Sequence, residues 1–176
     1  MTEETATRYD DAILKIATVA LRIINIVIFV MLCILLVFGT MAVFYQPSIA
    51  AELSRRGMHT PGGSVVPWIL LLMAAGAAIL VLAMRFFATL LKLMATVERG
   101  DPFVPENARR LRAMAWLLLA MEVVGFCTGA YASMVFKHSY GFDFSVTGLV
   151  AVLSLFVLAR VFARGTAMRD EIEGTV

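Results

Sequence analysis

The sequence predicts an all-α membrane protein, a bundle of four transmembrane helices with both termini in the cytoplasm. Its residues are 61% hydrophobic and 16% charged, against roughly half and a quarter in soluble domains. The hydrophobic residues also gather in four blocks, each close to the roughly 20 residues that a helix needs to cross about 30 Å of hydrocarbon. We therefore predict one membrane domain that includes all of residues 1–176.

The first two spans are predicted at about residues 23–45 and 65–90. The first carries no charged residue along its whole length. The second begins with Pro67 and Trp68, a helix-starting residue followed by an aromatic residue that prefers the membrane interface.

The third and fourth spans are predicted at about residues 113–136 and 144–162. Glu122 is the only charged residue inside the third. The fourth has a short uncharged core that ends before Arg160. We expect this arginine to extend its guanidinium to the lipid headgroups while its aliphatic stem lengthens the span.

The segments between the spans are short, apart from a predicted cytoplasmic loop at residues 91–112. Pro105 and Glu106 are expected to start the next helix, because proline fits a first turn and an acidic side chain there suits the helix dipole. A short amphipathic helix is expected around residues 50–56. Residues 163–176 form a predicted cytoplasmic tail, and Gly165 is expected to let the fourth helix bend or end at the membrane surface.

The distribution of lysine and arginine predicts the orientation in the membrane. Of 15 such residues, 12 belong to the N-terminal segment, the second loop with its flanking Arg85, and the tail with its flanking Arg160. Only Arg55, Arg56 and Lys137 lie on the other side. The positive-inside rule therefore places both termini in the cytoplasm. We assign this basic charge to lipid and topology and expect no direct nucleic acid binding.

The intramembrane acid Glu122 lies on a stripe of small residues. Gly125, Gly129 and Ser133 follow it by 3, 7 and 11 positions, which is one face of a helix. Small residues allow helix backbones to approach closely. We therefore expect this stripe to pack against another helix and to turn Glu122 toward the protein interior.

The second span has its own small residues, Ala74 and Ala78, on the face that carries Arg85. This arrangement predicts an ion pair between Arg85 and Glu122. The pair could serve as a proton, ion or ligand site, or it could only set helix register, and Glu122 could instead be protonated and bonded to a carbonyl. The predicted polar layer has four members: Glu122, Arg85, Asn25 and Arg160.

No set of residues with catalytic or metal-binding spacing is present in the sequence. His59 and His138 lie in different external loops, and Cys33 and Cys127 fall inside predicted spans. Neither histidine belongs to a metal-ligand motif. We therefore expect no catalytic residue, no cofactor and no metal, and an enzyme is the least favoured class.

Two segments carry a family resemblance. "VERGDPFVPENARRLRAMA" and "VFARGTAMRDEIEGTV" resemble the central loop and the terminal signature of a large bacterial family of unknown function, whose members are four-span membrane proteins. Gly174 departs from that signature, which has leucine there. The residues that carry the resemblance include Gly100, Pro102, Phe103, Asn107, Gly165, Arg169, Asp170 and Glu171.

The resemblance implies a multi-pass protein of the bacterial cytoplasmic (inner) membrane. Members of the family are commonly encoded beside Cro/CI-type helix-turn-helix regulators, which implies a soluble transcriptional regulator as a partner at the cytoplasmic face. We expect the loop and tail to form that face through pairs between basic loop residues and acidic tail residues. The alternative is a small transporter or channel subunit that uses Glu122 and Arg85 and assembles as a homo-oligomer. The predicted pairs join Arg109, Arg110 and Arg112 to Asp170, Glu171 and Glu173.

The predicted orientation can be tested with reporter fusions. Fusions after Arg99 and after Val176 should report the cytoplasm, and fusions near Gly62 and Ser139 the outside, because the charge split is 12 to 3. An external signal from the Arg99 fusion would invert the topology.

Overall fold

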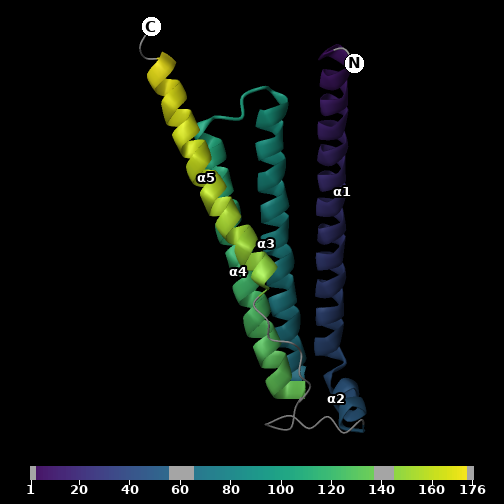
Figure 1. The fold of residues 1–176 in the computed structure, drawn as a ribbon. Helices are drawn as coiled ribbons and strands as arrows, with labels where there is room; N and C mark the ends of the chain where they lie inside the picture. The colour runs from purple at the N-terminus through teal and green to yellow at the C-terminus, as the bar shows by residue number, and fades with distance from the viewer. Residues whose placement is uncertain (1–2, 56–65, 137–144, 174–176) are drawn as a thin grey trace.

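The computed structural model describes residues 3–55, 66–136 and 145–173, and every element in these segments is helical. Four of the helices are long and apolar enough to cross a membrane, which confirms the predicted all-α class with four transmembrane helices. Figure 1 shows all five helices. Their bounds are α1 Glu3–Phe44, α2 Gln46–Arg55, α3 Val66–Glu98, α4 Pro105–Phe136 and α5 Val146–Glu173.

The long helices pack in chain order as antiparallel neighbours. α1 contacts α3, α3 contacts α4, and α4 contacts α5, whereas in the described segments α1 touches neither α4 nor α5, and α3 does not touch α5. The four spans therefore form an open row in which α1 has one long neighbour. The start of α1, the α3–α4 turn and the end of α5 lie at the same end of the protein (Figure 1), which we call the turn end.

The helices extend beyond the hydrophobic blocks at the turn end. α1 has 42 residues and is about 63 Å long at 1.5 Å per residue. α3 continues to Glu98 and α4 begins at Pro105, so only residues 99–104 of the expected loop 91–112 are not helical. Residues of good helix propensity continue a helix once its first turns exist, whether lipid or water surrounds it.

Two local expectations have different outcomes. The short helix expected around residues 50–56 is present as α2. Gly165 does not end the last helix, because α5 continues without interruption to Glu173.

The ends of the helices at the turn have identifiable causes. Gly100 has a φ of 77°, which glycine adopts without steric cost. Its N–H donates to the carbonyl of Val97 (3.0 Å), and the N–H of Asp101 donates to that of Thr96 (3.2 Å). These two bonds form a Schellman motif that satisfies the last carbonyls of α3. Pro105 then occupies the first position of α4, as predicted.

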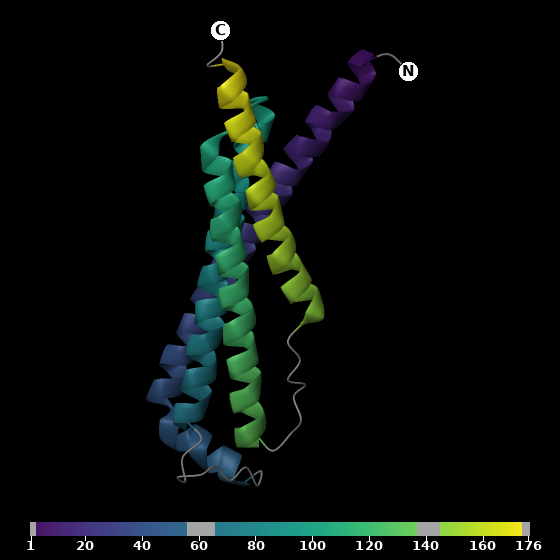
Figure 2. The same cartoon turned by 60° about the vertical axis from the view of Figure 1, so that its left-hand side comes forward.

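The best-packed part of the described chain lies between α4 and α5. α4 contributes Leu111, Met114 and Ala115, and α5 contributes Val152 and Ala159, all buried. Many large apolar side chains of α1 are exposed, as expected of a helix surrounded by lipid. Figure 2 shows α1 crossing the other helices obliquely, and it shows that α5 begins partway along α4.

Candidate functional site

The side chain of Asn107, in the first turn of α4, is fully buried with 0% exposure. Its Nδ2 donates to Oγ1 of Thr96 (2.7 Å) and to the carbonyl of Pro102 (2.8 Å). Its Oδ1 accepts a bond from Nη1 of Arg110 (2.9 Å). A buried amide without hydrogen-bond partners is costly, and these bonds offset the cost of burying the Asn107 side chain. They also join the end of α3, the turn and the start of α4.

Two of these partners extend the network to the last turns of α3. The Thr96 hydroxyl donates to the carbonyl of Leu93 (2.6 Å) while it accepts from Asn107. Nη1 of Arg110 also donates to the carbonyl of Lys92 (3.1 Å). The end of α3 and the start of α4 are therefore linked by side-chain bonds as well as by the turn.

Phe103 connects this turn to α5. Its ring lies 5.2 Å from the ring of Phe162, centroid to centroid, at an interplanar angle of 34°. A Cβ added at Gly165 would lie 2.9 Å from Cδ1 of Phe103, closer than real Cβ atoms approach. Gly165 therefore forms a notch in α5 that receives the ring, which explains a glycine inside a continuous helix.

The tail and the turn also form an ion pair, between Arg169 of α5 and Asp101. A contact between turn and tail was predicted, but with the opposite distribution of charge, because the base here is in the tail and the acid is in the turn. Arg110 bonds within the turn instead of to the tail. We call this set of residues the turn–tail cluster: Thr96, Gly100, Asp101, Pro102, Phe103, Asn107, Arg110, Phe162, Gly165 and Arg169.

Most of the residues that carried the family resemblance meet in this cluster. Gly100, Pro102, Phe103 and Asn107 lie in the turn and the first turn of α4, and α5 brings its own motif residues to them. The side chain of Asp170 lies outside the described residues, and Glu171 is exposed on α5. Sequence analysis missed Thr96 and Asp101, because no motif or spacing marks either residue as functional. Their roles follow only from the folded turn, in which Thr96 contacts Asn107 and Asp101 contacts Arg169.

Glu122 lies against the start of α5. A Cβ at Gly148 would overlap the Glu122 carboxyl group, so the carboxyl occupies the space where a side chain would otherwise be. Gly148 is the third residue of α5, and its N–H donates to Oγ of the capping residue Ser145 (3.0 Å). The acid therefore meets the positive end of the helix dipole, which sequence analysis did not foresee.

The predicted pair between Glu122 and Arg85 is not formed. α4 packs on α3 through the face that includes Val124, and two residues along a helix turn the side chain by about 200°. Glu122 thus faces away from α3, and Arg85 is exposed on that helix. Asn25 lies between α1 and α3, and Arg160 is exposed on α5. Among the described residues no hydrogen bond or ion pair joins any two of these four side chains, so they do not form one layer.

The small-residue stripes also differ from the expectation. An added Cβ at Gly125 or Gly129 would meet no described atom within 4 Å. α5 begins at Val146, beside Glu122, so no described residue of α5 lies opposite the stripe from Gly125 to Ser133. On α3, Ala74 and Ala78 are exposed, and it is Gly76 that approaches Leu35 of α1. Spacing alone identifies a face but not its neighbour.

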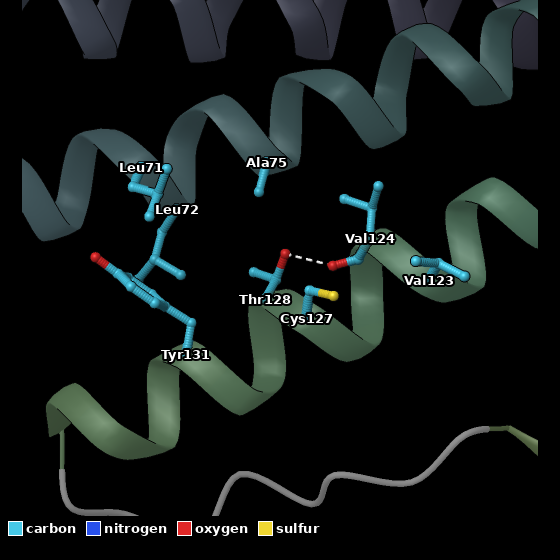
Figure 3. A pocket seen from close by; sticks show the side chains of 8 residues that line it. All are labelled: Leu71, Leu72, Ala75, Val123, Val124, Cys127, Thr128 and Tyr131. Carbon is cyan, nitrogen blue, oxygen red and sulfur yellow. Dashed lines mark hydrogen bonds between the residues drawn. The ribbon is translucent and has the colours of Figure 1, made fainter.

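An apolar hollow of about 290 Å³ lies between α3 and α4. Figure 3 shows the side chains that line it. The Thr128 hydroxyl donates to the carbonyl of Val124 (2.6 Å), so it offers no free proton to a ligand. Tyr131 stacks on Trp68 at one end, with ring centroids 4.8 Å apart. Cys127, which lines the hollow, and Cys33 are both free.

In the described segments, no group of three metal-ligating side chains is found. His59 and His138 lie outside the described residues.

The four long apolar helices define a multi-pass α-helical membrane protein. The sequence profile of the family described as "Protein of unknown function (DUF2975)" matches residues 54–176, and the chain belongs to this family. The match includes α3, α4, α5 and the whole turn–tail cluster, whereas α1 precedes it. Neither the curated proteins nor the solved structures gave a match.

Replacing Asn107 with leucine should lower the free energy of unfolding by about 3 kcal/mol, because the Thr96 hydroxyl and the Pro102 carbonyl lose their buried donor. Thermal unfolding of the purified protein in detergent measures this change. Arg112→Leu, at an exposed position of the same helix, is the control and should change the stability little. Equal losses in the two variants would show that the amide network does not hold the turn.

The contact between Glu122 and α5 predicts a coupled pair of substitutions. Gly148→Ala should destabilise the protein by about 1 kcal/mol, because the added methyl displaces the carboxyl group, and should be harmless when Glu122 is already alanine. Thermal unfolding of both single variants and of the double variant measures the coupling. Gly125→Ala, whose methyl meets no described atom, is the control. An equal loss from Gly148→Ala in both backgrounds would contradict the contact.

Proposed function

We propose that this protein is a non-enzymatic interaction protein of the bacterial cytoplasmic membrane and that its turn–tail cluster binds a soluble transcriptional regulator. The single observation that carries the proposal is the convergence of two motifs, distant in the sequence, on one surface at the turn end. Phe103 inserts at Gly165, and Asp101 pairs with Arg169. Residues 60 or more positions apart in the sequence are therefore held in one arrangement that a partner can recognise.

The surface of the cluster has the composition of a docking site. Phe103 remains 43% exposed although it packs on α5. Arg109 and Arg112 are exposed on the first turns of α4. An exposed aromatic side chain beside arginines is typical of the residues that dominate the energy of protein interfaces, and the charges favour a partner with an acidic patch.

Two further observations support the location and the identity of the partner, namely the charge distribution and the family resemblance. The charge split of 12 to 3 favours a cytoplasmic turn end, where a DNA-binding regulator could reach it. The family resemblance adds the helix-turn-helix regulators that are commonly encoded beside such proteins. The membrane protein would then hold the regulator through protein contacts and would not itself bind DNA.

The alternative, a small transporter or channel subunit, has weaker support. Its predicted centre was an ion pair of Glu122 with Arg85, and these two side chains do not meet. The Glu122 carboxyl group instead packs against the first turn of α5, which is a structural role. A transport path would require a homo-oligomer that uses the face near Gly125 and Gly129, where an added Cβ would meet no described atom.

The proposal predicts that the cluster is needed for capture of the regulator. Asp101→Arg should separate the tail from the turn by repulsion from Arg169 and should reduce recovery of the regulator at least fivefold in a membrane pull-down. The double variant Asp101→Arg with Arg169→Asp should restore part of the recovery, because it forms the pair in reverse. Deletion of residues 169–176 should abolish capture while the protein remains inserted and abundant.

The control is Arg55→Asp, on α2 at the opposite end of the protein, which should leave capture unchanged. Undiminished capture by both the Asp101→Arg variant and the truncated protein would exclude the cluster as the docking site. Loss of the protein itself on truncation would make the tail a structural element instead.

A further inference from the structure

A second hollow, of about 400 Å³, lies between α1 and α3 and is independent of the turn–tail cluster. Arg22 and Asn25 line it from α1 together with Ile26 and Phe29. These positions follow one face of the helix, since they are spaced by three, four and seven residues. Met84 and Leu91 complete it from α3. The hollow is therefore polar toward the turn end and apolar farther along the span.

The guanidinium of Arg22 is the cationic part of this hollow. Arg22 is the last charged residue before the uncharged stretch that begins at Ile23, which places it where the hydrocarbon meets the headgroups. It is exposed and forms no hydrogen bond or ion pair with any described residue. A cation at this depth is complementary to a lipid phosphate.

Asn25 supplies a second, independent observation. Its Oδ1 is buried and has no hydrogen-bond partner in the described protein. A shielded amide oxygen is costly unless a donor reaches it. In a helix the side chain tilts toward the N-terminus, so the amide of Asn25 leans toward Arg22, one turn earlier. A ligand that suits both groups therefore needs an anion and a hydrogen-bond donor close together.

The rest of the hollow suits an acyl chain. Ile26, Phe29 and Met84 continue along the face away from Arg22, and the seven residues from Arg22 to Phe29 correspond to about 10 Å. Such a surface binds hydrocarbon and offers nothing to a free inorganic ion. The amphipathic character of the site thus favours a lipid over phosphate alone.

We propose that the hollow binds an anionic phospholipid whose headgroup carries a hydroxyl, of the phosphatidylglycerol type. Its phosphate contacts the Arg22 guanidinium, and one acyl chain lies along Ile26 and Phe29. A headgroup hydroxyl donates to Oδ1 of Asn25 once the amide rotates to bring this oxygen into the hollow. Because α1 has α3 as its only long neighbour in the described segments, the bound lipid joins α1 to the rest of the protein.

The test is a native mass-spectrometry titration of the full-length protein in detergent with three lipids. Phosphatidylglycerol has both the anion and the hydroxyl, phosphatidylmethanol has the anion without a donor, and phosphatidylcholine has neither a net charge nor a donor. We expect affinity to fall in that order, with roughly a fivefold step for the lost hydrogen bond and a larger step for the lost charge. Inorganic phosphate alone should not compete.

Two variants show which side chain recognises which part of the lipid headgroup. Asn25→Leu should reduce the affinity for phosphatidylglycerol to that for phosphatidylmethanol. Arg22→Gln should reduce the affinity for phosphatidylmethanol to that for phosphatidylcholine and should leave phosphatidylglycerol only the roughly fivefold advantage of its hydroxyl. Arg160→Gln removes an exposed arginine from α5 and serves as the matched control, with no expected change in the order of the three lipids.

Thermal unfolding distinguishes a lipid ligand from a structural asparagine. Without added lipid, Asn25→Leu should be at least as stable as the unaltered protein, because the unsatisfied oxygen is gone, and phosphatidylglycerol should raise the unfolding temperature of the unaltered protein more than that of the variant. Equal affinity for the three lipids, competition by phosphate alone, or a loss of stability in Asn25→Leu at every lipid concentration would each overturn the proposal.

Discussion

The buried amide of Asn107 is the interaction on which the arrangement at the turn end depends. Its bonds to Thr96, Pro102 and Arg110 hold the six residues between α3 and α4 in one conformation. Only that conformation directs Phe103 into the notch at Gly165. In lipid, helices gain little from hydrophobic burial against each other, so hydrogen bonds and close packing set their positions. One polar side chain thus positions a helix that begins about 40 residues later.

The rest of the structure loosens with distance from this turn. The buried apolar residues of α4, from Ala108 to Ala115, lie in the half of that helix nearest to it. Farther along, α5 begins beside Glu122 and leaves the face from Gly125 to Ser133 without a described neighbour. The carboxyl group of Glu122 lies against the start of α5, in the space that a side chain at position 148 would fill, so this contact requires glycine there.

The two proposed sites use different pairs of helices and different chemistry. The turn–tail cluster joins α3, α4 and α5 through an amide, an aromatic ring and an ion pair, within the residues that match the family. The hollow at Arg22 and Asn25 lies between α1 and α3. Because α1 contacts neither α4 nor α5 in the described segments, lipid can bind beside α1 while the cluster keeps its geometry.

The sequence by itself determined the all-α class, the four spans, the short helix α2 and the start of α4 at Pro105, because these follow from hydrophobic length and from local backbone preferences. It also identified the motif residues that meet at the turn end. Only the tertiary structure decided that Arg169 pairs with Asp101, that Gly165 receives Phe103 inside a continuous helix, and that Glu122 meets α5 and not Arg85. The physical reason is that helical periodicity defines which residues share a face, whereas the neighbour of each face depends on how the helices pack against one another.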